Sequence, residues 1–277
     1  MSSTPEPTPE PMPTPMPTPR PPLVAVSLKA YLGAAATADW LAGVRDLAVG
    51  GAVDGASGAG AVELAVLPSF PLLPVAARVL EGTAVAWGAQ DVAPSDAGAQ
   101  TGEVTAPLLA ELGCRYAVVG HAERRARFGD TDEVVRAKVA RLAEAGVVPL
   151  LCVGETERLP ADEAADVAAA QLADALTGTG ATDVVVGYEP VWAIGAPEPA
   201  GPEHVVAVAD RLHAALAGLG VPGRVVYGGA AGPGTLTALA PAVDGVFLGR
   251  FAHDVAALGD VLAEARRVAA PGAAVTR

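Results

Sequence analysis

The sequence has little positive charge. Its 277 residues include 18 lysines and arginines against 31 aspartates and glutamates, which gives a formal net charge of -13 and an isoelectric point near 4.7. Lysine occurs only at Lys29 and Lys138. A protein that binds nucleic acid needs a basic face to neutralise phosphates. The composition therefore argues against a nucleic-acid-binding protein.

Cysteine and long apolar runs are also scarce. Two cysteines, Cys114 and Cys152, cannot form a disulfide framework for a chain of this length. They fit a reducing cytoplasm, and we expect both to be buried in the core. Although 51% of the residues are hydrophobic, no stretch reaches the roughly 18 uninterrupted apolar residues that a membrane span needs. The sequence predicts a cytoplasmic protein that does not interact with a membrane.

The first 22 residues, MSSTPEPTPEPMPTPMPTPRPP, differ in composition from the rest. Proline at every second or third position blocks helices and sheet ladders, so we predict a disordered or polyproline II tail over residues 1–22. The segment lacks the basic start and the apolar stretch of a signal peptide. It is interpreted either as a solvated extension or as a ligand for the proline-binding groove of a partner. Residues 23–277 contain no evident linker and are predicted to form one domain.

From Leu23 onward, short apolar runs alternate with longer helical patterns in eight strand–helix units. Continuous apolar runs are typical of strands that are covered on both faces. Helices are predicted over Asp132–Ala145, capped by Thr131, over Pro202–Leu219, and near His253–Val268. The predicted strands are Leu23–Leu28, Val62–Leu67, Ala84–Gly88, Tyr116–Gly120, Val147–Val153, Asp183–Tyr188, Arg224–Tyr227 and Gly245–Leu248.

Eight units of about 31 residues, each the size of a βαβ unit, favour an α/β fold of the closed (β/α)8 type, a TIM barrel. A doubly wound open sheet is the alternative. The sequence argues against the open sheet, because the first predicted strand leads into SLKAYLG rather than into the G-x-G-x-x-G turn of dinucleotide-binding sheets. The barrel is therefore the predicted architecture.

Polar residues stand at the ends of the predicted strands, which share one face of a parallel barrel. A carboxylate base, an imidazole and a cation suit proton transfer next to a carbonyl group. Glycine pairs after the last two strands suit a phosphate, because backbone N–H groups are accessible there. The pattern predicts a barrel enzyme for a small phosphorylated carbonyl compound. Its residues are Lys29, Gln90, His121, Glu155, Glu189, Gly228-Gly229 and Gly249-Arg250.

Each of these residues also has a purely structural interpretation. Lys29 suits a solvated strand end, His121 suits a helix cap, and Glu189 suits a loop carboxylate. His204 and His213 are interpreted as ordinary surface or flank residues of a helix. The His, Cys, Asp and Glu residues show no metal-binding spacing, so no metal is predicted.

Five motifs resemble those of the triosephosphate isomerase family, and the resemblance covers residues 23–270. It implies a TIM-barrel isomerase of glycolysis and gluconeogenesis that interconverts glyceraldehyde 3-phosphate and dihydroxyacetone phosphate. It implies no cofactor, because an intramolecular proton shuttle needs no redox carrier and no metal. The motifs are AQD…AGAQTGE (89–103), GHAERR (120–125), LCVGET (151–156), YEPVWAIG (188–195) and YGG (227–229).

The resemblance also implies roles for individual residues. Glu189 matches the base that moves a proton between adjacent carbons, and His121 matches the neutral imidazole that polarises the carbonyl. Lys29 matches the cation that faces the enediolate, and Glu123 matches the second carboxylate beside the histidine. The substrate- and phosphate-binding residues are expected to be Ser27, Gly195, Gly228, Gly229, Gly249 and Arg250.

Two loops have further implied roles. Residues 190–200 match a lid that closes over the substrate and excludes water. Thr101 matches the loop that reaches a neighbouring subunit's active site, which implies a homodimer.

The chain departs from the family pattern near the phosphate and the lid. Ser27 stands in place of an asparagine, Ala122 and Ala230 in place of serines, and Arg250 in place of a glycine; the lid motif T-G-K-T is replaced by residues 196–199, APEP. The Arg250 guanidinium suits bidentate contact with a phosphate, or else points away as a surface residue. Three interpretations stay open: a triosephosphate isomerase, an isomerase of a four-carbon ketose phosphate such as erythrulose phosphate, and a non-catalytic phosphosugar-binding barrel.

Overall fold

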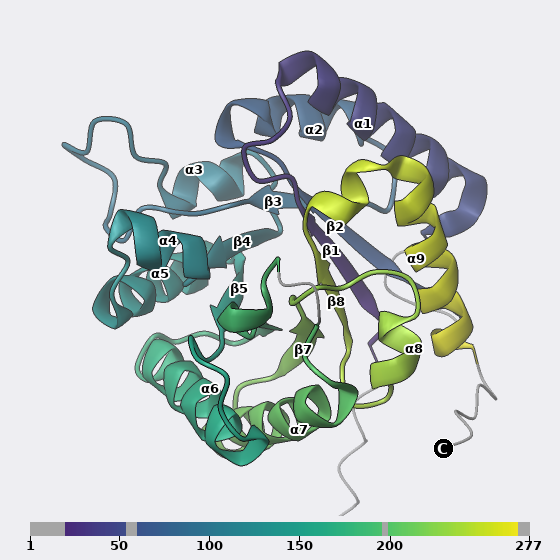
Figure 1. Cartoon of the computed structure of the whole chain (residues 1–277). Coiled ribbons are helices and arrows are strands. Elements are labelled where there is room, and N and C mark those ends of the chain that lie inside the picture. The colour runs from purple at the N-terminus through teal and green to yellow at the C-terminus, as the bar shows by residue number, and fades with distance from the viewer. Residues whose placement is uncertain (1–19, 54–59, 196–198, 271–277) are drawn as a thin grey trace, which may run out of the picture.

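Eight short apolar segments form parallel strands that close into a barrel in sequence order, β1 to β8. The computed structural model describes residues 20–53, 60–195 and 199–270. Figure 1 shows the ring of strands with helices outside it. The strands are β1 (Leu23–Ser27), β2 (Glu63–Leu67), β3 (Ala86–Ala89), β4 (Tyr116–Val119), β5 (Val148–Val153), β6 (Val184–Tyr188), β7 (Gly223–Tyr227) and β8 (Gly245–Leu248).

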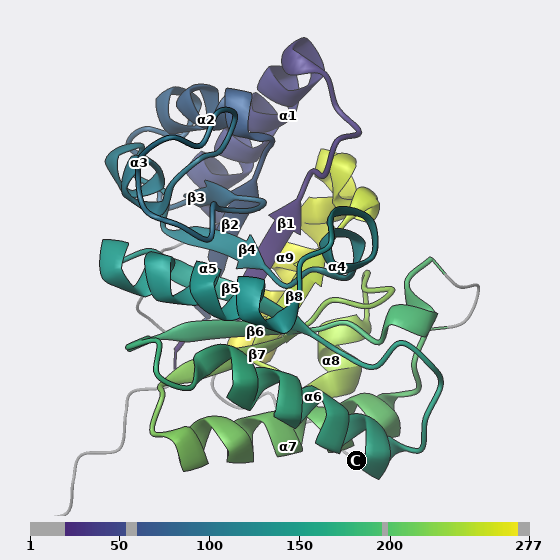
Figure 2. The ribbon, with the colours of Figure 1, turned by 90° about the vertical axis from the view of Figure 1, so that its left-hand side faces the viewer.

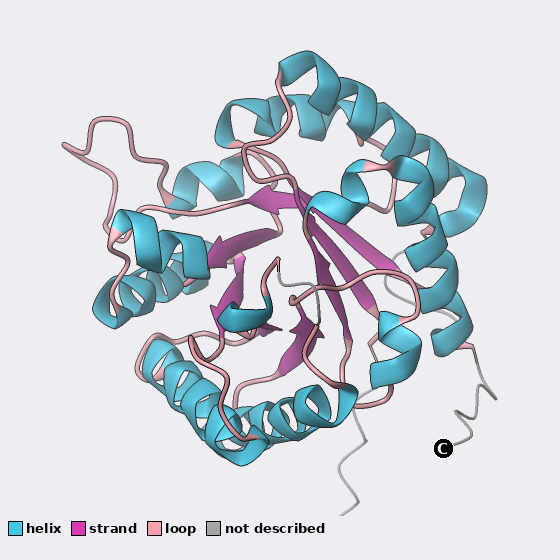
Figure 3. Cartoon of the chain, in the orientation of Figure 1, coloured by secondary structure: helices cyan, strands magenta, loops and turns pink. Residues whose placement is uncertain are grey.

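Helices follow the strands and cover the outer face of the ring, as the colours of Figure 3 make clear. Figure 2 shows α6 and α7 lying side by side outside β6 and β7. Short 3-10 turns occur at Phe70–Leu72, Val191–Ala193 and Arg250–His253, and a π-type segment follows α1 at Ala48–Ala52. The α-helices are α1 (Ala34–Leu47), α2 (Leu73–Val79), α3 (Ala106–Glu111), α4 (Ala122–Phe128), α5 (Asp132–Ala145), α6 (Ala161–Leu176), α7 (Pro202–Leu219), α8 (Thr235–Leu239) and α9 (Val255–Ala269).

The barrel is closed because β1 pairs with both β2 and β8. Continuous apolar strands allow this closure, since one face of each strand packs inside the ring and the other against the helices. The larger core lies between strands and helices, and a smaller cluster that includes Leu67, Val118 and Phe247 fills the ring. The prediction of a closed (β/α)8 barrel is confirmed, and the open sheet is excluded.

The predicted element boundaries agree closely with the structure. Helix α5 spans the predicted residues, with the Thr131 side chain accepting a hydrogen bond from the Val134 N–H, and α7 also has its predicted bounds. The last helix, predicted near His253–Val268, is α9, Val255–Ala269, and it begins two residues later than predicted. The predicted tail over residues 1–22 lies, up to residue 19, outside the described residues, as does part of the predicted lid, residues 196–198.

Both cysteines are buried, as predicted, and burial raises the pKa of the Cys114 thiol to about 11. Among the described residues, no helix is long and apolar enough to cross a membrane.

Candidate active site

Lys29 leaves the carboxyl end of β1 in an unusual backbone conformation. Its φ of 49° makes it the one non-glycine residue with a positive φ among those the structure describes. Left-handed backbone at a residue with a Cβ is strained and persists where the surroundings hold it. Here the Ser69 hydroxyl and the Gln90 amide each donate a hydrogen bond to the Lys29 carbonyl oxygen, both at 3.1 Å. These two contacts hold the Lys29 backbone in this conformation.

The Lys29 ammonium group meets a carboxylate from the first turn of α4. Its Nζ lies 2.7 Å from Glu123 Oε1. Burial opposes ionisation of Glu123, but the hydrogen bond and the charge of Lys29 outweigh it and hold the pKa of Glu123 below its ordinary value. The Glu123 carboxylate therefore stays ionised and forms an ion pair with the Lys29 ammonium group beside the site.

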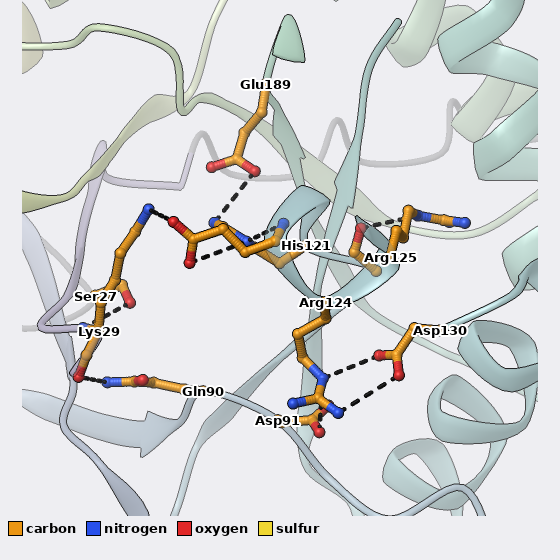
Figure 4. A network of polar contacts seen from close by, with 11 residues as sticks. Ser27, Lys29, Gln90, Asp91, His121, Arg124, Arg125, Asp130 and Glu189 are labelled. Carbon is orange, nitrogen blue, oxygen red and sulfur yellow. Dashed lines mark hydrogen bonds and ion pairs between the residues drawn. The ribbon is translucent and has the colours of Figure 1, made fainter. Parts of the chain in front are cut away.

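His121 caps the N-terminus of α4, so the predicted structural role and the position at the site coincide. Its Nδ1 accepts a hydrogen bond from the Glu123 backbone N–H at 3.1 Å. A ring nitrogen that accepts carries no proton, so the proton of the imidazole is on Nε2. Nε2 points to Glu189, which places a neutral N–H donor in the site (Figure 4).

Glu189 follows β6 and faces His121 across the barrel mouth. Its Oε2 lies 3.6 Å from His121 Nε2, and within the described part of the chain this oxygen is buried without a hydrogen-bond partner. Burial is the main influence and raises the pKa of the Glu189 carboxyl above its ordinary value, although the positive charge of Lys29 acts in the opposite direction. A desolvated carboxylate with a raised pKa is a stronger base than one in water, as a general base requires.

Two glycines create the space that Glu189 occupies. A Cβ at Gly228 would stand 2.8 Å from Glu189 Cγ, and one at Gly154 would stand 2.1 Å from the Glu189 carbonyl oxygen. Both distances are shorter than real Cβ contacts, so any side chain at either position would displace the carboxylate or its backbone. Gly228, predicted as a phosphate contact, therefore also fixes the position of Glu189.

One cavity of about 670 Å³ brings most of the predicted site residues together. We call it the main cavity. Arg250 is exposed on its wall and makes no hydrogen bond or ion pair with any residue that the structure describes. Nine of the ten predicted site residues line the cavity, namely Ser27, Lys29, His121, Glu189, Gly195, Gly228, Gly229, Gly249 and Arg250.

A second cavity of about 320 Å³ adjoins the main cavity on the side of β2, β3 and β4. We call it the side cavity. It contains Glu123, the tenth predicted residue, together with Ser69, Gln90 and Phe128. Ser27, Lys29 and His121 line both cavities.

The sequence did not indicate several contributors to the site. Tyr31 and Phe251 are large, half exposed and part of the main cavity wall. Ser69 supports Lys29 from a loop forty residues further along the chain. No local pattern marks these side chains, because their role depends on which loops meet at the barrel mouth.

His204 was predicted to be an ordinary surface or flank residue of a helix, and the structure gives it specific polar contacts. Its Nε2 lies 3.0 Å from the Tyr188 hydroxyl and 3.3 Å from Glu155 Oε1. Glu155, which is 1% exposed, also accepts a hydrogen bond from the Trp192 indole at 2.7 Å. This cluster supports the segment that follows Glu189, so Glu155 and His204 lie behind the site rather than in the main cavity.

The fold and the site together define the class of the protein, which is an α/β-barrel enzyme. Its parallel strands close into a barrel, and a carboxylate, an imidazole and an ammonium group surround one cavity at the mouth. The sequence profile of triosephosphate isomerase matches residues 22–265. The chain belongs to the triosephosphate isomerase family, so the predicted family and the predicted isomerase class are confirmed.

Relatives within this family carry two different names. The L-erythrulose-1-phosphate isomerase of Pectobacterium atrosepticum is 44% identical over 253 residues, which cover 87% of this chain and 95% of that protein. The triosephosphate isomerase of Thermus thermophilus is 45% identical over 198 residues, which cover 68% of this chain and 79% of that protein. The crystal structure of triosephosphate isomerase from Bartonella henselae superposes with a TM-score of 0.75 at 29% identity and covers 89% of this chain and 99% of that one.

Proposed function

We propose that the protein isomerises a short-chain ketose phosphate through an enediolate, with Glu189 as the base. The observation that carries this proposal is the Glu189 carboxylate facing a neutral His121 N–H at 3.6 Å on the wall of a glycine-edged cavity. A four-carbon ketose 1-phosphate such as L-erythrulose 1-phosphate is the first candidate substrate. It is favoured by the relative of that name, which matches over 95% of its length, and by the altered phosphate loops. Triose phosphate is the second candidate.

The reaction divides among three side chains. The Glu189 carboxylate removes a proton from the hydroxyl-bearing carbon next to the carbonyl, and the electrons of that C–H bond form the enediolate double bond. The His121 Nε2–H and the Lys29 ammonium group stabilise the negative oxygen. Glu189 then returns its proton to the former carbonyl carbon, while the proton of the neighbouring hydroxyl group passes by way of His121 Nε2 to the former carbonyl oxygen. The carbonyl has moved by one carbon, and no atom has been gained or lost.

According to this proposal, the phosphate binds at the glycine edge of the main cavity. Gly195, Gly229 and Gly249 line the cavity, and without side chains they let a phosphate approach the backbone. Ala230 lacks a hydroxyl at the same edge. The Arg250 guanidinium makes no hydrogen bond or ion pair with the described residues, and it can give a phosphate two parallel hydrogen bonds.

Replacing Arg250 with alanine should therefore weaken substrate binding. Loss of a charged hydrogen-bond pair costs about 1.5–3 kcal/mol, so KM should rise about 10- to 100-fold, with a smaller change in kcat. The KM of Arg250→Lys should lie between those of wild type and Arg250→Ala, since lysine keeps the charge but not the bidentate geometry. Arg211→Ala, which removes only an exposed pair with Asp166, is the matched control. An unchanged KM in Arg250→Ala would make Arg250 a surface residue that points away from the phosphate.

We also propose a cytoplasmic homodimer in which the loop around Thr101 approaches the partner's site. This loop, between β3 and α3, projects from the barrel at the upper left of Figure 1. Nearby, Phe128 and Leu108 are 67% and 43% exposed, and such apolar surface favours a covered face. Phe128 also lines the side cavity, which offers space for a loop of the partner. Analytical ultracentrifugation of the full chain should give twice the chain mass, and a purely monomeric chain that turns over substrate at full rate would contradict this arrangement.

The function itself is tested by kinetics with purified protein. Each candidate substrate is supplied separately, and proton exchange at the reacting carbon is followed in deuterated water. The proposal requires turnover of at least one substrate together with deuterium incorporation. Tight binding without any exchange would instead support a non-catalytic phosphosugar-binding barrel.

A further inference from the structure

Glu155, one of the polar residues at the predicted strand ends, is a buried carboxylate with several donors around it. It lies shortly after β5 and is 1% exposed. Its Oε1 accepts a hydrogen bond from the Trp192 indole at 2.7 Å, and the Tyr188 hydroxyl lies 3.2 Å from each of its oxygens. His204 Nε2 completes the cluster, 3.3 Å from Glu155 Oε1 and 3.0 Å from the Tyr188 hydroxyl. The three partners come from the end of β6, from the turn after it and from the first turn of α7.

The contacts show where the protons of this cluster lie. Burial and the negative charge of Glu155 raise the pKa of the Tyr188 phenol above its ordinary value, so the phenol keeps its proton and donates it to the carboxylate. The phenol oxygen then accepts from His204, so the imidazole carries a proton on Nε2. His204 is therefore a hydrogen-bond donor that faces both the phenol oxygen and the carboxylate.

The cluster contacts the chain on both sides of Glu189. Tyr188 directly precedes Glu189, and Trp192 follows it by three residues. The Glu155 carbonyl oxygen also accepts a hydrogen bond from the Val191 N–H at 2.9 Å. Within the described residues, Glu189 Oε2 has no hydrogen-bond partner, so the placement of the carboxylate depends on the backbone that carries it. Contacts that fix this backbone therefore fix the distance between the base and its substrate.

We infer that His204 is a positioning residue for the isomerisation, which holds the Glu155 cluster together and thereby holds Glu189 at the site. This inference rests on the proposed function. His204 belongs to α7, whereas Tyr188 and Trp192 belong to β6 and the turn after it. The imidazole thus joins α7 to the strand end that carries the base. Without its N–H, the Tyr188 oxygen and the Glu155 carboxylate lose a donor in a buried place, which favours rearrangement of the cluster.

The test compares His204→Phe with His204→Gln in the full chain, assayed with the candidate substrate that wild type prefers. Phenylalanine keeps a ring near those of Tyr188 and Trp192, whose centroids lie 6.5 and 6.0 Å from that of His204, but it has no donor. Glutamine keeps an N–H donor at a similar distance from the backbone. Since a displacement of about 1 Å can cost about 100-fold in rate, kcat should fall about 10- to 100-fold in His204→Phe and stay within about threefold of wild type in His204→Gln. KM should change little, because the proposed phosphate contacts come from other residues.

Two further variants show whether the effect is specific. His213→Phe is the matched control on the same helix, because His213 pairs only with Asp244 among the described residues and both side chains are partly exposed. Its kcat should equal that of wild type. Glu155→Gln shows whether His204 acts through the carboxylate, in which case adding His204→Phe to Glu155→Gln lowers kcat no further.

A merely structural role of His204 gives a different result. His204→Phe would then unfold at a lower urea concentration than wild type while the folded enzyme kept its kcat, and this result would overturn the inference. An equal loss of kcat in His204→Phe and His204→Gln, or additive losses in the double variant, would also overturn it. If His204→Phe does not fold, as judged by circular dichroism, His204→Leu takes its place under the same criteria. Failure of the proposed function looks different, because wild type would then turn over neither candidate substrate.

Discussion

Glu189→Gln is expected to lower kcat by about 10²–10⁴, the usual contribution of a positioned general base. Glutamine has nearly the same shape, so the buried position opposite His121 is kept while the basic oxygen is lost. KM should change little, since the proposed phosphate contacts come from Gly195, Gly229, Gly249 and Arg250 and not from the Glu189 carboxylate. Steady-state kinetics with the preferred substrate measures the effect.

The raised pKa of Glu189 gives this variant two further signatures. In wild type the base must be ionised, so kcat/KM should fall as the pH drops through an apparent pKa above the ordinary glutamate value of about 4.3. The stability of the fold depends on pH in the opposite direction to kcat/KM. A carboxyl whose pKa is higher in the folded state than in the unfolded state favours folding at low pH and opposes it once the pH exceeds the folded value. Glu189→Gln should therefore melt at a higher temperature than wild type at neutral pH.

Glu203→Gln, an exposed carboxylate in the first turn of α7, is the matched control and should leave kcat and the melting temperature unchanged. Glu189→Asp keeps the charge but withdraws it by one methylene, so it should also lose activity, because proton transfer depends on close approach. Wild-type turnover in Glu189→Gln would show that another group is the base.

The architecture of the site follows from the sequence because it depends on strand order. Lys29, His121 and Glu189 each stand directly after a short apolar run, and parallel strands bring all such positions to one mouth. The strand Gly245–Leu248 and the helix Asp132–Ala145 were predicted with their observed bounds, since a glycine or a capping threonine marks their ends. Apolar periodicity and end signals are local properties, which a single sequence displays.

Contacts between distant loops are not local, and they carry what the sequence did not reveal. The strained backbone of Lys29 depends on Ser69 and Gln90, and no pattern around either residue predicts that contact. Lys138 is a second residue whose contacts could not be predicted from the local sequence. On sequence it is one charged position within an amphipathic helix, yet in the structure it is 2% exposed. Its partners come from other segments of the chain, so only the tertiary structure explains why a lysine is buried there.

Lys138→Met is expected to lower the free energy of unfolding by about 3–5 kcal/mol, the usual cost of removing one partner from a buried ion pair. The Lys138 Nζ lies 2.7 Å from Asp91 Oδ1 and 2.6 Å from Asp130 Oδ2. Arg124 Nε contacts the same two carboxylates at 2.8 and 3.0 Å, so two cations balance two anions. Methionine has a similar length and fills the space, which leaves the uncompensated negative charge as the cause of the loss. Urea unfolding measures it.

The pH dependence of this variant separates charge from packing. Burial already raises the pKa of Asp91 with the lysine present, and removing the lysine raises it further. Protonation then removes the unpaired charge, so the stability difference between Lys138→Met and wild type should shrink as the pH is lowered from 7 toward 5, whereas a packing defect would persist. Arg136→Met on the same helix, which breaks a half-exposed pair with Asp174, should cost less than about 1 kcal/mol. If Lys138→Met lowers the free energy of unfolding no more than Arg136→Met does, the buried negative charge left by the loss of the lysine is not destabilising. Because Arg124 lies in α4, the helix that His121 caps, a real stability loss should be accompanied by reduced kcat.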